Sequence, residues 1–201
     1  MIRNGHSQTG FRDFVLAMER VELRLRRVTA ALDDAGIRYA VVGGNAVAAW
    51  VAQVDPGATR TTKDVDLLVA RTDLDRITQV LTGIGLKRED LRSLTLFVDP
   101  DEPSRKSGVH LVWAGEKVRP SYEQPAPRVE ESVRAPDGFL VLELAALVRM
   151  KLTSLRDIDR VHIADLVRVG LIDDAVRAAV PPPLRSRLDE IDRSVSEEDS
   201  F

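Results

Sequence analysis

Two stretches, RYAVVGGN at residues 38–45 and TTKDVDLLV at residues 61–69, decide the predicted fold. The first is a short β-prone run that the glycine pair at 43–44 stops, and the alanine-rich residues after it are compatible with a helix. A strand, a tight turn and a helix are therefore expected in this order. The second stretch reads as a strand in which Asp64 and Asp66 alternate with apolar residues, so both carboxylates project from one face.

These residue types at this spacing indicate a metal and phosphate site. Asp64 and Asp66 repel each other unless a cation lies between them, and hard oxygen ligands on one face suit Mg²⁺. Gly43 and Gly44 precede a predicted helix and would present backbone N–H groups and a helix N-terminus to an anion such as a triphosphate. Each feature is common by itself, and their order along the chain makes the combination more specific.

The rest of the pattern mixes helices and strands, which predicts the α/β (α+β) class. Apolar residues at three- and four-residue steps predict an amphipathic helix over 11–32 and a second helix over 72–84, and strands are expected over 94–98 and 109–113. The predicted organisation is an N-terminal amphipathic helix at 1–36, a core at 37–118, an irregular proline-rich connection at 119–138, a helical C-terminal portion at 139–180, and a partly disordered acidic tail at 181–201.

Composition removes several classes of chemistry. The 201 residues include no cysteine, which excludes disulfides, a thiolate nucleophile and a Cys-ligated metal site. The net charge of −3 excludes a chain that is basic throughout, so any nucleic-acid contact must be a local patch. No apolar stretch reaches the ~20 residues of a membrane-spanning helix, and no signal-peptide pattern is seen. We therefore expect a cytoplasmic protein with no membrane partner.

Two motifs follow each other in the chain: Val41-Val42-Gly43-Gly44, and then Thr62-Lys63-Asp64-Val65-Asp66-Leu67. This order resembles the polymerase-β-like nucleotidyltransferase superfamily, in which an apolar strand, Gly-Gly or Gly-Ser and a helix precede Asp-x-Asp or Asp-x-Glu. The lead-in Arg60-x-Thr62 before the aspartates is similar to the abortive-infection (type IV) toxin-like group. The helical part of that group has a Lys, Arg, Asp pattern, which is matched here by Lys151, Arg156, Asp159, His162 and Asp165. The resemblance covers roughly residues 38–172.

The resemblance implies a nucleotidyltransferase fold, with a mixed sheet flanked by helices, and a Mg²⁺- or Mn²⁺-dependent transfer of a nucleoside monophosphate from an NTP. The acceptor would be an RNA, a protein or a small hydroxylated molecule, and a toxin-like role would add a cognate antitoxin as partner. The residues carried over are the catalytic metal ligands Asp64 and Asp66, and the nucleotide-binding Gly43, Gly44, Lys151 and Arg156.

One position departs from the family pattern, which has a third carboxylate on a later strand. In this chain the expected position is occupied by His110, in the strand over 109–113. Imidazole is a poor Mg²⁺ ligand but a reasonable general base. Three readings are open: His110 acts as the base, Glu116 or an acid within 99–102 supplies the carboxylate, or the site is catalytically degenerate and only binds nucleotide or a partner protein.

Overall fold

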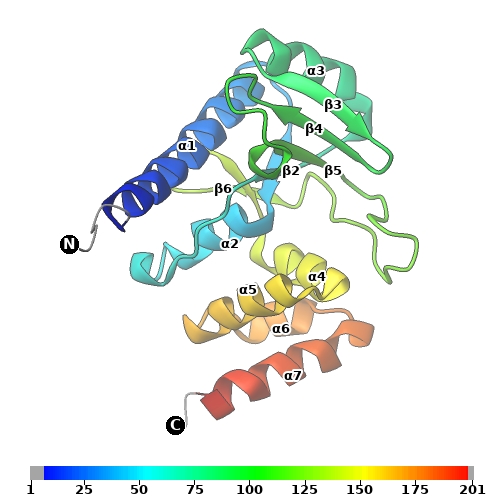
Figure 1. Cartoon of the computed structure of the whole chain (residues 1–201). Coiled ribbons are helices and arrows are strands. Elements are labelled where there is room, and N and C mark those ends of the chain that lie inside the picture. The colour runs from blue at the N-terminus through cyan, green and yellow to red at the C-terminus, as the bar shows by residue number, and fades with distance from the viewer. Residues whose placement is uncertain (1–6, 199–201) are drawn as a thin grey trace, which may run out of the picture.

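The computed structural model describes residues 7–198, and its centre is a mixed sheet of seven strands (Figure 1). The strands lie in the order β3-β4-β5-β2-β1-β7-β6, so β2 is the central one. The strands are β1 (Tyr39–Val42), β2 (Val65–Val69), β3 (Lys87–Leu91), β4 (Leu94–Val98), β5 (Val109–Trp113), β6 (Ser132–Arg134) and β7 (Leu140–Leu142).

The register of the central strands places three functional candidates next to one another. The apolar residues of β1 and β2 are buried, as expected for strands covered on both faces. β1 runs antiparallel to β2, and β5 runs parallel to it. In this register Asp66 lies between Val42 of β1 and His110 of β5. A carboxylate, an imidazole and the end of β1 therefore meet at one end of the sheet.

Some helices flank the sheet, and others, α4 to α7, form a cluster below it in Figure 1. They are α1 (Ser7–Asp34), α2 (Gly43–Val51), α3 (Leu74–Gly83), α4 (Leu144–Ser154), α5 (Asp157–Arg168), α6 (Asp174–Ala179) and α7 (Pro182–Glu198), with 3-10 turns at Pro56–Ala58, Arg71–Asp73 and Arg105–Ser107. α1 contacts α3, and α2 contacts β2, α4 and α5, so α2 joins the sheet to the helical cluster. Within residues 7–198, none of the helices combines the length and the apolar character that crossing a membrane requires.

The α/β class and the mixed sheet flanked by helices are confirmed. So are the helices and strands predicted over 11–32, 72–84, 94–98 and 109–113, within a few residues at their ends. The sequence pattern missed β3, because its residues KREDL alternate too little to indicate a strand. β3 lies at the edge of the sheet, where charged side chains are favoured because they discourage pairing with other chains.

The expected irregular connection at 119–138 and the expected helical portion from 139 are wrong in one respect: β6 and β7 lie there. β7 pairs parallel with β1 through Val141 and Val41, and β6 pairs antiparallel with β7. A three-residue apolar run directly before a helix has no periodicity of its own, so the sequence pattern does not separate β7 from the helix that follows.

The predicted acidic tail at 181–201 is also corrected, because residues 182–198 form α7. Proline is compatible with the first turn of a helix, so Pro181 precedes α7 and Pro182 and Pro183 lie in its first turn instead of ending the structure. The buried residues repeat at helical spacing: Leu184, Leu188, Ile191 and Val195. The disorder expected for the last residues falls on 199–201, which lie outside the described part of the chain.

A packed α7 predicts a clear difference between two substitutions in the same helix. Leu188→Ala removes a side chain that is 2% exposed and should lower the free energy of unfolding by about 2–5 kcal/mol. Ser186→Ala, at an exposed position, should change it by less than about 0.5 kcal/mol. Urea unfolding of both variants measures the difference, and equal values would contradict the packing of α7.

Candidate active site

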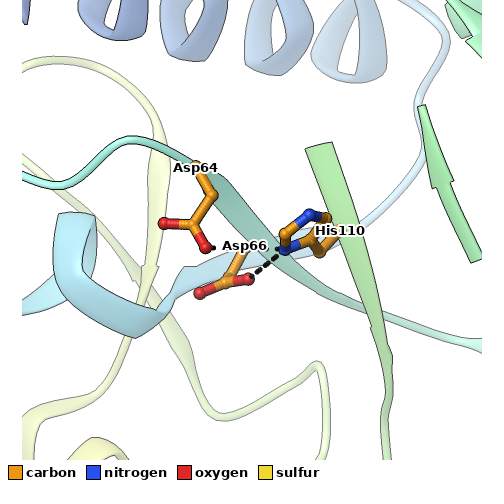
Figure 2. Close-up of side chains that lie close together, drawn as sticks. All are labelled: Asp64, Asp66 and His110. Atoms are coloured by element: carbon orange, nitrogen blue, oxygen red, sulfur yellow. Dashed lines mark ion pairs between the residues drawn. The ribbon is translucent and has the colours of Figure 1, made fainter. Parts of the chain in front are cut away.

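Asp64, Asp66 and His110 converge on one small space. Asp66 lies on β2, Asp64 directly precedes that strand, and His110 faces them from β5 (Figure 2). His110 Nδ1 is 3.4 Å from Asp66 Oδ1 and 3.5 Å from Asp64 Oδ2. One ligand atom from each of the three residues lies within 4.8 Å of the others, and all three side chains are partly buried. The two predicted ligands and the predicted base are thus one cluster.

The other ring nitrogen of His110, Nε2, is held by a backbone carbonyl group. Nε2 lies 2.8 Å from the carbonyl oxygen of Arg105, which can only accept a hydrogen bond, so Nε2 carries a proton. Nδ1 is therefore the atom that faces the aspartates. Its interaction with Asp66 raises the pKa of the His110 imidazole, burial opposes this, and the Arg105 carbonyl adds to the rise.

Gly43 is required by its backbone and by the nearness of Asp66. Its φ is +67°, a region that L side chains rarely adopt, and a Cβ atom there would lie 2.0 Å from Asp66 Oδ2. Gly44 is also closely approached, because its Cβ would lie 3.0 Å from the Cβ of Thr62. The first turn of α2 is thus in close contact with Asp66 and Thr62, and its N-cap, Val42, makes no side-chain capping bond to the helix.

Asp64 is positioned by two residues to which the sequence analysis gave no role. Thr62 Oγ1 donates to Asp64 Oδ1 over 2.7 Å, and Asn45 Nδ2 donates to the Asp64 carbonyl oxygen over 2.7 Å. Arg60, in the same segment, binds both carboxylate oxygens of Asp165 on α5, at 2.6 and 3.1 Å. The Arg60-x-Thr62 spacing before the aspartates is the sequence feature that could indicate a role for Thr62. No local pattern points to Asn45.

Three of the four predicted nucleotide-binding residues, Gly43, Lys151 and Arg156, share one cavity with Asp66. Its wall includes Gly43, Asp66, Lys151, Arg156, Asp159 and Tyr122. Residues more than a hundred positions apart in the chain therefore face a common space. Gly44 lies beside this cavity, at the start of α2.

Lys151 is buried, whereas a lysine that binds phosphate from solvent would be exposed. It is 3% exposed, and its Nζ lies 2.8 Å from His162 Nδ1 and 3.3 Å from Asp159 Oδ1. Burial lowers the pKa of the Lys151 amine, against the attraction of Asp159. Burial and the charge of Lys151 lower the pKa of His162 to about 4, so this imidazole is neutral near pH 7.

Arg156 is brought to the cavity by a sharp turn between α4 and α5. Leu155 ends α4 with φ +46°, a conformation that costs a bulky residue about 1–3 kcal/mol. The Arg156 guanidinium then donates to both oxygens of Asp159, at 2.7 and 3.1 Å, and more than half of the side chain stays exposed. Although burial opposes it, the bonds from Arg156 help hold the pKa of Asp159 down at about 2.

Glu116 and Glu102, two of the acids considered as a replacement third carboxylate, are engaged elsewhere. Both oxygens of Glu116 accept from Arg71, at 2.6 Å each, and Glu102 accepts from Arg24 at 2.9 Å. Within residues 7–198, the group of acids and histidines suited to a metal ion contains only Asp64, Asp66 and His110. The structure therefore does not support the reading in which Glu116 or an acid within 99–102 completes the site.

Comparison with protein-family models and with curated proteins finds no match. Solved structures do match. The solution structure of the antibiotic-resistance factor ANT(2'')-Ia covers 90% of this chain and 97% of its own, with 15% identity and a TM-score of 0.54. The crystal structure of the Megavirus polyadenylate synthase covers 86% of this chain and 39% of its own, with 11% identity and a TM-score of 0.51. The chain therefore has the nucleotidyltransferase fold that the order of its two motifs predicts.

The neutral His162 predicts acid sensitivity of the fold. The unfolded chain protonates this residue near its ordinary pKa of 6.5, whereas the folded chain does so only near 4. The unfolded state thus binds more protons between these values, so the free energy of unfolding should fall as the pH drops from about 6.5 to about 4. Lys151 of α4 and Asp159, Asp165 and Arg156 at α5 are the charges that act on this group.

Urea unfolding at a series of pH values measures this dependence. His162→Gln, which has no titrating group, should show a shallower fall over the same range. Identical slopes for the two proteins would contradict a neutral buried His162.

Proposed function

We propose that this chain is a divalent-metal-dependent nucleotidyltransferase, which moves a nucleoside monophosphate from an NTP to a hydroxyl group of an acceptor. The observation that carries this proposal is the meeting of Asp64, Asp66 and His110 in one cluster, of which Asp66 also lines a cavity together with Gly43 of α2 and Arg156 of the α4–α5 turn. Carboxylates for a metal, a helix N-terminus and two cationic side chains are the groups that this chemistry needs.

The donor set fits a divalent cation. Two carboxylates and one imidazole nitrogen lie within 4.8 Å of one another, and the charges of Asp64 and Asp66 call for a cation between them. Mg²⁺ or Mn²⁺ bound there would neutralise the triphosphate and make an acceptor hydroxyl easier to deprotonate. Thr62 and Asn45 hold Asp64 in place, and the first turn of α2 limits where the Asp66 carboxylate can lie.

The chain's own residues account for nucleotide binding. The backbone N–H groups in the first turn of α2 favour phosphate oxygens because of the helix dipole. Gly43 has no side chain to hold the phosphates away from this backbone. The exposed guanidinium of Arg156 can bind a phosphate in two places, and Lys151 adds buried positive charge behind it.

The acceptor is an RNA, a protein or a small hydroxylated molecule in this proposal. Of the two matching structures described above, one is named a polyadenylate synthase and the other an antibiotic-resistance factor, so the fold is not tied to one acceptor. A cytoplasmic location, a toxin-like role of the abortive-infection kind and a cognate antitoxin stay predictions from the sequence.

A second candidate is a degenerate module that binds nucleotide or a partner protein without transfer. The observation that favours it is His110 in place of the third carboxylate of the family pattern. Calorimetry separates the two candidates, because ATP binding by an active site of this kind depends on a divalent cation. Equal ATP affinity with and without Mg²⁺ or Mn²⁺ would favour the degenerate module.

Removing the negative charges should abolish transfer. In Asp64→Asn and Asp66→Asn variants, incorporation of label from α-labelled NTPs should fall about 100-fold or more, because the cation loses a ligand. The assay contains Mg²⁺ or Mn²⁺ with tRNA, lysate protein or small hydroxylated acceptors. Asp75→Asn, an exposed acid on α3, is the matched control and should retain activity. If no acceptor is labelled by the unmodified chain, the proposed activity is wrong.

Thr62 should act through Asp64. Thr62→Val keeps the shape of the side chain but removes the hydroxyl that donates to Asp64 Oδ1, so transfer should fall about 10-fold. Thr61→Val, at the exposed neighbouring position, should leave transfer unchanged. Similar losses in both variants would contradict a specific role of the Thr62 hydroxyl.

A further inference from the structure

His110 has only one nitrogen available for chemistry, and that nitrogen faces two carboxylates. Nε2 is committed to the Arg105 carbonyl at 2.8 Å. In the neutral ring the proton therefore sits on Nε2, and the lone pair of Nδ1 points at the space shared with Asp64 and Asp66. A histidine anchored through one nitrogen by a backbone carbonyl, with the other facing acidic groups, has the arrangement usual for metal-binding histidines.

The distances show that His110 Nδ1 faces both aspartates without a short hydrogen bond to either. Nδ1 is 3.4 and 3.5 Å from the nearest oxygens of Asp66 and Asp64, beyond the ~2.7–3.2 Å of a normal N–H···O hydrogen bond. The register of β2 and β5 places His110 directly beside Asp66, and Thr62 fixes the rotamer of Asp64. The three ligand atoms are therefore oriented by independent parts of the structure toward the same point.

We infer that His110 binds the catalytic cation directly through Nδ1, and that the site therefore selects Mn²⁺ over Mg²⁺. This inference rests on the proposed function, in which Asp64 and Asp66 hold that cation. Mg²⁺ prefers all-oxygen ligands and its own water shell, whereas a mixed set of two carboxylates and an imidazole suits first-row transition ions. A coordinated Nδ1 cannot accept a proton, so the same geometry excludes His110 as the general base while the cation is bound.

Metal binding to the full chain tests this without an activity assay. Calorimetry with each ion alone should show Mn²⁺ binding about 10-fold or more tighter than Mg²⁺. In His110→Asp, which restores an all-oxygen set, this ratio should fall toward one. His110→Gln leaves an amide group in place of the ring and lacks Nδ1, so it should lose Mn²⁺ affinity. Circular dichroism checks that both variants are folded.

Pulsed electron paramagnetic resonance of bound Mn²⁺ provides a direct signature. The chain should show electron-spin-echo modulation from a coordinated imidazole ¹⁴N, and both His110 variants should lack it. Mn²⁺ binding without this modulation, or an unchanged Mn²⁺/Mg²⁺ ratio in His110→Asp, would overturn the inference and leave the proposed function standing. Absence of binding by either ion, in the chain and in Asp64→Asn alike, would overturn both.

Discussion

The candidate site depends on one close approach: the backbone at the start of α2 lies directly against the carboxylate of Asp66. β1 and β2 pair so that Val42 lies opposite Asp66, and the chain must turn from β1 into α2 at the next residue. Only glycine fits there, since the backbone is left-handed at Gly43 and a Cβ would collide with Asp66 Oδ2. The first turn of α2 is thereby held against the carboxylate of Asp66, which leaves the backbone donors of a helix N-terminus beside it.

Helices α4 and α5 and the turn between them contribute Lys151, Arg156 and Asp159 to the cavity that Asp66 lines. α2 contacts both the sheet and α4 and α5, so the position of Asp66 and the position of Lys151 are set by one packed unit. Arg60 adds a direct link, because it ties the segment before Asp64 to Asp165 on α5. The strained Leu155 lies at the turn that delivers Arg156 to Asp159. Strain at such a point is typical of functional sites, where the surrounding structure maintains an unfavourable backbone conformation.

Local spacing was enough to predict the parts of the site that lie within one strand–turn–helix unit. The alternation in β2 placed Asp64 and Asp66 on one face, and the glycine pair marked the start of α2. Long-range contacts were not predictable in this way. The bond from Asn45 to the Asp64 backbone, the contact of Lys151 with His162, and the pairing of β7 with β1 depend on tertiary packing. α7 was missed because its acidic and proline content outweighed the helical spacing of its four buried aliphatic residues.

In the proposed function, the histidine at the third carboxylate position of the resembled family matters less for proton transfer than for metal binding. Nucleotidyl transfer depends mainly on alignment of the reacting groups and on stabilisation of the charge that develops on the phosphate. A general base contributes typically ~10²–10⁴-fold to such reactions, and a bound cation already eases deprotonation of the acceptor hydroxyl. A missing ligand would instead weaken the binding of the cation that offsets the repulsion between Asp64 and Asp66. An imidazole that binds the cation, as proposed, would therefore be compatible with transfer, and a histidine at the position of the resembled family's carboxylate does not by itself indicate a degenerate site.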